Sequence, residues 1–184
     1  MLTRMIPSPL IRTIVEWLIA ATFAFLLFLF LRNFVFRIAD VSGISMEPTL
    51  SNNDMVLLTR VGYWFNDPVP GDIIAFPYQE NPSEHFIKRV FGVPGDVIDF
   101  DFELARFTIN GEVPDFDIGT THIFDAGDIE YPYTVPDGHF FVLGDNRNMS
   151  KDSRFQSVGS IPKEDIVGKV VLRFWPFASF GGVE

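Results

Sequence analysis

The sequence predicts a mostly β fold, a compact domain of antiparallel sheets behind one N-terminal transmembrane helix. An apolar run without any charge extends from Trp17 to Leu31. Beyond Asp40, helical periodicity gives way to short runs of β-branched and aromatic residues. These runs are separated by glycine, proline and asparagine, and the chain has 14 glycines and 13 prolines, which is typical of a fold with many turns.

We interpret residues 14–36 as a membrane anchor and residues 1–13 as a cytoplasmic tail. The segment reaches a spanning length once its flanks are included, and Glu16 and Arg32 then fall near the two interfaces. Two alternatives are a cleavable signal peptide and a buried core helix. The bulky, charged stretch "RNFVFRI" offers no small-residue cleavage site, and the remaining chain has few helices to cover an apolar one. The positive-inside rule gives a weak preference for a cytoplasmic N-terminus.

Residues 38–184 are expected to form the β domain. Strand-like runs include "MVLLTR", "DIIAFPY", "HFIKRVFG", "VIDFDF", "HFFVLG" and "IVGKVVLRF". In "RFTINGEV", Asn110-Gly111 predicts a hairpin with a type I′ turn. Residues 99–136 leave room for a small cap only, and its irregular, acidic part, 114–136, is expected to be a surface excursion. Most of the 21 phenylalanines are expected to pack in the core, and the aromatic tail "RFWPFASF" is a candidate for contact with the bilayer.

Composition excludes several classes of function. The formal net charge is −10, and four of the arginines lie within residues 1–37. An acidic body of this kind does not favour nucleic acid as a partner. The chain has no cysteine, which excludes disulfides, thiolate metal sites and a cysteine nucleophile. Its three histidines lack the spacing of a zinc helix. We expect no metal site.

The stretch "SGISMEPTL", Ser42 to Leu50, lies a few residues beyond the apolar segment. Gly43 frees the backbone and Pro48 fixes it, so a rigid turn should hold the Ser45 hydroxyl at a set angle. Met46 is flexible and apolar, which suits it to lie along a membrane or an apolar substrate. Alone, the stretch is better explained as an ordinary polar linker.

In "HFIKRVFGVPGD", strand alternation places Phe86, Lys88 and Val90 on one face and Ile87 on the other, with Arg89. A lysine between apolar neighbours on a core-facing surface should have its pKa lowered by desolvation, and a neutral amine is a usable general base. The simpler explanation is a lysine whose ammonium reaches solvent from an edge strand.

The stretch "GDNRNMSKDSR", Gly144 to Arg154, begins with turn residues. Asp152 and Arg154 can pair, and Ser150 or Ser153 can point inward, although a solvated loop explains the same composition. A serine nucleophile needs a base. No Ser-His-Asp triad is evident, whereas a pairing of Ser45 with Lys88 follows the same logic. Sequence spacing alone does not show that the two residues meet.

Together these stretches resemble the type I signal peptidases, membrane-anchored Ser/Lys proteases that remove signal peptides from exported proteins. The resemblance rests on "SGISMEPTL", "GDIIAFPY", "FIKRVFGVPGD" and "GDNRNMSKDSR", in this order behind the apolar segment, from about Val41 to Phe174. It implies a fold of antiparallel sheets, no cofactor and cleavage after small residues at Ala-x-Ala sites. It also implies a single-pass protein of the cell membrane with its catalytic domain outside the cytoplasm. The implied partners are preprotein signal peptides and the lipid bilayer, and we expect a monomer.

The resemblance also implies roles for particular residues. The serine before methionine, Ser45, corresponds to the nucleophile, the lysine of "KR", Lys88, to the general base, and Ser150 to the serine that orients the lysine. The residues that match supporting positions of the family are Arg89, Asp145, Asp152 and Arg154.

The chain departs from many relatives at one position of this site. Those relatives have a serine two places before the nucleophile that completes the oxyanion hole, whereas this chain has Gly43. The Ser45 N–H is the first expected donor. The Ser42 hydroxyl and a backbone N–H near Gly43 are candidates for the second.

Three alternatives to a general signal peptidase stay open at this point. A self-cleaving repressor domain shares the Ser/Lys logic, but the anchor argues against it. A specialised peptidase for conjugation or pilus subunits fits the same motifs. A membrane-tethered β domain with a decayed site is disfavoured because Ser45, Lys88 and Ser150 are all present.

Overall fold

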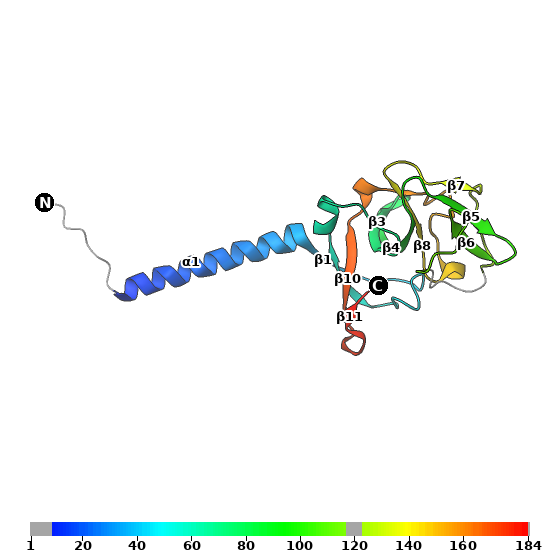
Figure 1. Ribbon diagram of the computed structural model, residues 1–184. Helices are drawn as coiled ribbons and strands as arrows, with labels where there is room; N and C mark the ends of the chain where they lie inside the picture. The colour runs from blue at the N-terminus through cyan, green and yellow to red at the C-terminus, as the bar shows by residue number, and fades with distance from the viewer. Residues whose placement is uncertain (1–8, 117–122, 184) are drawn as a thin grey trace. The chain divides into compact units, whose positions relative to one another are not determined.

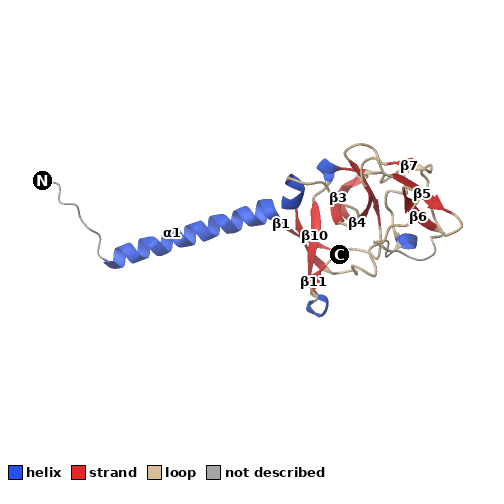
Figure 2. Ribbon diagram, in the orientation of Figure 1, coloured by secondary structure: helices blue, strands red, loops and turns tan. Residues whose placement is uncertain are grey.

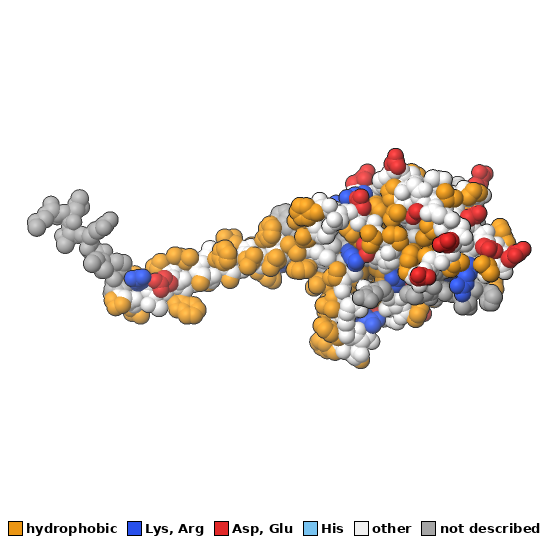
Figure 3. All heavy atoms as spheres, in the orientation of Figure 1, with side chains coloured by type: hydrophobic (Ala, Val, Ile, Leu, Met, Phe, Trp, Pro, Cys, Tyr) orange, Lys and Arg blue, Asp and Glu red, His pale blue; other side chains and the backbone are white. Residues whose placement is uncertain are grey.

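The computed structural model describes residues 9–116 and 123–183, and the chain divides into two compact units, 1–36 and 37–184. In the first unit, helix α1 (Pro9–Phe30) is followed by one π-helical turn (Leu31–Val35). None of the described α1 side chains is buried, and apolar side chains line its length in Figure 3. Arg12 and Glu16 form an i,i+4 ion pair at 3.0 Å.

Helix α1 is long and apolar enough to cross a membrane, judged by length and composition, and it is the one such helix among the described residues. Its 22 residues span about 33 Å at the usual rise, comparable to the ~30 Å hydrocarbon core of a bilayer. The helix begins at Pro9, earlier than the predicted anchor start at residue 14. The predicted tail lies mostly outside the described residues.

The second unit is built mainly of antiparallel strands, as the sequence predicts (Figures 1 and 2). The order of the larger sheet is β1-β2-β10-β3-β4-β8-β9, and β11 pairs with β10. The bounds of its strands are β1 Phe36–Asp40, β2 Met55–Thr59, β3 Ile73–Tyr78, β4 Asn81–Gly92, β8 His139–Leu143, β9 Ile161–Pro162, β10 Gly168–Trp175 and β11 Gly181–Gly182. Helical structure among the described residues of this unit is limited to short 3₁₀ turns at Val61–Trp64, Arg147–Met149, Lys163–Asp165 and Phe177–Ser179.

Apolar side chains cover both faces of the central strands. Ile73, Ala75 and Ile87 belong to one buried cluster, whereas Ile74 and Val90 belong to another. This division follows the alternation of side chains along β3 and β4. The alternation predicted for the "HFIKRVFG" strand is therefore confirmed, with the difference that both of its faces are buried.

A second, three-stranded sheet of order β6-β5-β7 forms the cap, from β5 (Val97–Asp101) and β6 (Arg106–Ile109) to β7 (Tyr133–Thr134). The predicted turn is present, with φ of 54° at Asn110 and 89° at Gly111. The hairpin is not, because Ile109–Glu112 is a single bridge and β6 pairs with β5 instead.

The interpretation of 114–136 as a surface excursion is wrong at two described positions, although most of its other described residues are exposed or half-buried. Ile123 and Val135 are buried with Ile98, Phe107 and Phe141 in a third apolar cluster. Residues 117–122 of the predicted excursion lie outside the described residues.

The expectation that most phenylalanines pack in the core is also wrong. Six described ones are buried (Phe76, Phe91, Phe100, Phe107, Phe140 and Phe141), whereas ten are exposed, among them four in α1. An apolar helix without a protein partner leaves its aromatic side chains uncovered. Phe177 and Phe180 of the aromatic tail are exposed as well, with Trp175 stacked edge-on against Phe177.

Candidate active site

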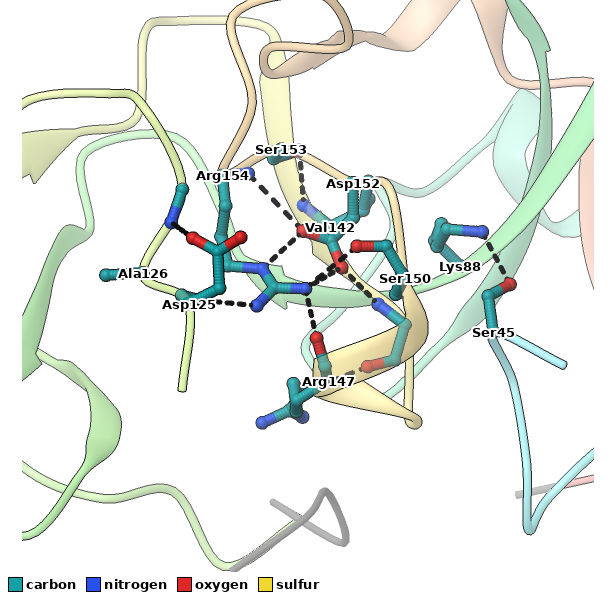
Figure 4. A network of polar contacts seen from close by, with 12 residues as sticks. Ser45, Lys88, Asp125, Ala126, Val142, Arg147, Ser150, Asp152, Ser153 and Arg154 are labelled. Atoms are coloured by element: carbon teal, nitrogen blue, oxygen red, sulfur yellow. Dashed lines mark hydrogen bonds and ion pairs between the residues drawn. The ribbon is translucent and has the colours of Figure 1, made fainter. Parts of the chain in front are cut away.

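The three stretches singled out in the sequence meet in the second unit (Figure 4). Lys88, from β4, places its Nζ 2.9 Å from the Oγ of Ser45, although 43 residues separate them in the chain. The same amine donates to the Ile87 carbonyl at 3.0 Å. Lys88 is 3% exposed, so its ammonium does not reach solvent from an edge strand. The pairing that spacing alone left open is present in the structure.

Burial lowers the pKa of Lys88 to about 8, against the opposing effect of the Asp152 and Asp145 carboxylates. The desolvation cost of the charged form is the largest cause, as expected for an amine in an apolar setting. The Phe86 ring lies 4.8 Å from Nζ and forms part of that setting. A large fraction of the amine is therefore neutral near pH 8, and a neutral amine can accept the proton of Ser45.

The turn that carries Ser45 is fixed from inside. Met46 is 2% exposed and packs with Val41 and Leu50, so it lies in the core and not along a membrane, although it also borders the cleft at Ser45. Its apolar side chain anchors the turn. The Leu50 N–H donates to the Met46 carbonyl at 2.9 Å, and Gly43 has a φ of +91°, a conformation that favours glycine.

A second turn holds the Ser45 backbone from the other side. Asn146 donates its N–H to the Ser45 carbonyl at 3.0 Å and its Nδ2 to the Ile44 carbonyl at 3.2 Å. Gly144 lies against Ser45 and Ser150. A Cβ at this position would be 2.2 Å from the Ser150 Oγ and 2.5 Å from the Ser45 carbonyl oxygen. The sequence marked this stretch as turn chemistry but did not reveal these contacts.

The four residues predicted as support form two buried ion pairs. Arg89 binds Asp145 through two bonds of 2.9 and 2.8 Å, and Arg154 binds Asp152 through two bonds of 2.7 and 3.0 Å. Two-bond pairing of this kind fixes geometry as well as charge. The Arg89–Asp145 pair is new information, because the sequence indicated no partner for either residue.

Each pair immobilises one segment of the site. Thr49 donates to Asp145 at 2.6 Å, which ties the first pair to the Ser45 turn. Asp152 accepts the Gly144 N–H at 3.0 Å, and Arg154 donates to the carbonyl of Ser150 at 3.1 Å. Thr49 is a supporting residue that the sequence analysis missed, and no pattern around it marks such a role.

Ser150 is buried beside the site, but its Oγ has no hydrogen-bond partner among the described residues. The structure therefore shows no bond between Ser150 and Lys88. Gly43 donates its N–H to the Asn52 Oδ1 at 2.9 Å, so this group is engaged. The Ser42 hydroxyl makes no hydrogen bond within the described part of the chain, and the residue is exposed.

A cleft of about 500 Å³ opens at the Ser45–Lys88 pair. It lies between residues 40–46 and residues 84–88, and Met149 and Lys151 complete its lining. A neighbouring hollow of about 390 Å³ shares Asp40, Ser42 and Ile87 with it. Among the described residues, no group of His, Asp and Glu side chains could hold a metal ion.

A serine hydroxyl held against a buried lysine amine at the base of a cleft is the arrangement of a serine hydrolase with a lysine base. The model of the family described as "Signal peptidase, peptidase S26" matches residues 14–175. This chain therefore belongs to the signal peptidase family S26. It is a serine endopeptidase that removes signal peptides from preproteins, and the predicted resemblance is confirmed.

Curated relatives are similar over most of the chain. Signal peptidase IB of Staphylococcus aureus (strain COL) is 33% identical over 182 residues, covering 92% of this chain and 93% of that protein. Signal peptidase I of Leptolyngbya laminosa is 40% identical over 159 residues, covering 82% and 74%. The crystal structure of a signal peptidase I from Enterococcus faecalis V583 is 29% identical, with a TM-score of 0.46, covering 56% of this chain and 97% of that one.

Proposed function

We propose that Ser45 is the nucleophile and Lys88 the general base of a peptidase that cleaves preproteins after small residues at Ala-x-Ala sites. The 2.9 Å contact between Ser45 Oγ and Lys88 Nζ carries the proposal. A nucleophile and base within hydrogen-bond reach, with the base desolvated, is the geometry that serine activation requires.

In this mechanism the neutral Lys88 amine accepts the proton of the Ser45 hydroxyl as Oγ attacks the scissile carbonyl. Lys88 then donates that proton to the leaving nitrogen, which frees the C-terminal product and leaves an acyl-enzyme. A water molecule, activated by the same amine, hydrolyses the ester. The hydrogen bond from Nζ to the Ile87 carbonyl supports the role by limiting where the amine can point.

The developing oxyanion needs donors. We assign the first to the Ser45 N–H. Because the Gly43 N–H is engaged by Asn52, the Ser42 hydroxyl is the better of the two candidates for the second donor. Loss of one such donor typically costs ~10²–10³ in rate, so Ser42→Ala provides a direct test.

Ser150 is proposed to orient Lys88 during the reaction. Its hydroxyl is buried without a hydrogen-bond partner among the described residues, which is a costly state for a polar group. A hydrogen bond with the Lys88 amine during the reaction would satisfy that hydroxyl. Gly144 supports this idea, because the absence of a Cβ leaves room for Ser150 next to the Ser45 backbone.

Substrate is proposed to bind as an extended strand. Strand β4 pairs with β8 only from Arg89 to Gly92, so the same edge of residues 84–88 lies open along the cleft. A peptide can add to a strand edge of this kind through backbone hydrogen bonds. The neighbouring hollow, with Leu58, Ala75 and Ile87 in its lining, offers an apolar surface for a small side chain.

Helix α1 is proposed to anchor the chain in the cell membrane as a single-pass monomer, with residues 38–184 on the extracytoplasmic side. The exposed Trp175, Phe177 and Phe180 are proposed to contact the bilayer. Tethering would hold the nucleophile close to cleavage sites that emerge at the membrane surface, which raises its effective concentration.

The test uses purified full-length protein in liposomes and a secretory precursor with an Ala-x-Ala site, with products identified by mass spectrometry. Wild type should cleave after the second alanine, whereas Ser45→Ala and Lys88→Arg should be inactive, because arginine cannot serve as a base near neutral pH. Turnover by either variant would refute the dyad. A folded but inactive wild type would favour a specialised peptidase with another substrate.

A further inference from the structure

Lys151 is a feature of the cleft that the proposed mechanism does not use. It lines the cleft together with Ser45 and Lys88. Lys88 and Lys151 are the two lysines among the described residues of this lining. The carboxylates of the lining, Asp40 and Glu84, come from the segments that also border the neighbouring hollow. Asp40 and Glu84 thus lie where the cleft meets the hollow, whereas Met149 and Lys151 line the cleft but not the hollow.

The position of Lys151 relative to the base follows from a short aromatic ladder. The Phe86 ring lies 4.8 Å from the Lys88 Nζ and stacks on Tyr78, with centroids 4.5 Å apart and 8° between the planes. The Lys151 Nζ lies 4.7 Å from the Tyr78 centroid. Two stacked rings therefore lie between the Lys88 and Lys151 amines, and Lys151, unlike Asp40 and Glu84, does not line the neighbouring hollow.

In the proposed binding mode, the leaving chain passes along the end of the cleft away from the hollow. The base that takes the proton from Ser45 later gives it to the leaving nitrogen, so this nitrogen has to come close to the Lys88 amine. In the proposed binding mode, the acyl part stays at Ser45 and extends toward the hollow. The first residues of the released product then extend along the rest of the cleft, which Met149 and Lys151 line.

The backbone of Lys151 is fixed while its side chain stays available. Ser150 and Asp152, its neighbours, are both held by the Arg154 guanidinium. The Lys151 side chain is 46% exposed and lies 3.4 Å from the Glu80 carboxylate, whose side chain is 62% exposed, and it also donates to the Tyr78 hydroxyl. An exposed ion pair of this kind contributes little stability, so a substrate carboxylate can replace Glu80 at small cost.

We propose that Lys151 is a specificity residue that favours an acidic side chain among the first residues of the mature chain, just after the cleavage site. The inference rests on the proposed function, because it needs the leaving chain to run past Lys88. Its chemistry is a charge-assisted contact between the Lys151 ammonium and an Asp or Glu carboxylate.

The experiment compares two precursors that differ only by Glu or Gln at the first mature position, and repeats the pair at the second position. The readout is the ratio of kcat/KM for the Glu precursor to that for the Gln precursor. Wild type should favour Glu roughly two- to fivefold at one of the two positions, the range of a half-exposed ion pair. This ratio of kcat/KM values should fall toward one in 1 M salt, because salt screens the interaction between the two charges.

Three variants separate charge recognition from a structural effect. Lys151→Gln should abolish the preference, and Lys151→Glu should reverse it and favour a Lys precursor over the Gln precursor. Glu80→Gln, which removes the competing carboxylate, should strengthen the preference for Glu. Lys163→Gln is the matched control, because Lys163 is a similarly exposed lysine in an ion pair with Asp67 and does not line the cleft; its ratio should equal that of wild type.

The outcomes distinguish this inference from the proposed function. If wild type cleaves the Gln precursor but shows no preference for Glu at either position, the role of Lys151 is refuted and the dyad stands. The same conclusion follows if the preference persists in Lys151→Gln and Lys151→Glu. If wild type cleaves no precursor, both proposals fail.

Discussion

Replacement of Lys88 by methionine should inactivate the enzyme and stabilise its fold. Burial lowers the pKa of Lys88 from 10.5 to about 8. At ~1.4 kcal/mol per pKa unit, protonation of the buried amine costs the folded state about 3 kcal/mol. Methionine has a similar shape and no charge, so Lys88→Met should recover most of that free energy of unfolding wherever the wild-type amine is charged.

The stability gained by Lys88→Met should depend on pH, because Lys88 loses its proton at a lower pH in the folded chain than in the unfolded chain. Between about pH 8 and 10.5 the unfolded chain keeps the Lys88 proton and the folded chain has lost it, so the wild type gains stability as pH rises. Below about pH 8 the full cost is present, and above 10.5 it is absent. The advantage of Lys88→Met should therefore be about 3 kcal/mol at pH 6–7 and should disappear as pH approaches 10.5.

The assay is denaturant unfolding of full-length protein in detergent micelles, followed by near-ultraviolet circular dichroism from pH 6 to 10. The control is Lys163→Met, at a lysine whose side chain is 39% exposed. The difference in free energy of unfolding between this variant and wild type should not show the pH dependence expected of Lys88→Met. A Lys88→Met difference that stays constant across the range would refute the claim that Lys88 is desolvated.

Three other predictions follow from the site. The kcat/KM of wild type should rise about tenfold per pH unit and level off above about pH 8; a rise that continues to pH 10.5 would contradict a lowered base pKa. Asp152→Asn leaves the Arg154 guanidinium buried without its carboxylate, so it should cost ~3–5 kcal/mol in chemical unfolding, and a loss below ~1 kcal/mol would contradict this. Gly144→Ala should lower kcat about 10²-fold in precursor cleavage by displacing Ser45 or Ser150; an unchanged kcat would show that the turn adapts.

Local patterns in the sequence were sufficient for the fold class and for the central strands β2, β3, β4, β8 and β10. The alternation of Ile73 to Phe76 and of Phe86 to Val90 predicts strands because neighbouring side chains must enter different apolar clusters. The cap was harder. Its strands are short, and Ile123 and Val135 contribute to its core from outside them. Such packing depends on contacts between distant segments, which no local period encodes.

The candidate site shows the same division between local and distant information. Glycine, proline and other turn residues indicated that "SGISMEPTL" and "GDNRNMSKDSR" form turns. Asp152 and Arg154 are close enough in sequence to suggest an ion pair. The Arg89–Asp145 pair spans 56 residues and the Lys88–Ser45 contact spans 43. Only the sheet brings these groups together, so the residues alone left each of them with an ordinary alternative.

The two buried ion pairs matter for Lys88 as the proposed base, because this lysine lies near two carboxylates. Asp145 and Asp152 each raise the pKa of Lys88, and left unpaired they would favour the charged amine, which cannot act as a base. Arg154 opposes that effect. The same arginine fixes the backbone of Ser150, and Arg89 ties Asp145 to the Ser45 turn through Thr49. Both arginines therefore position the site, and Arg154 also offsets the effect by which the two aspartates raise the pKa of Lys88.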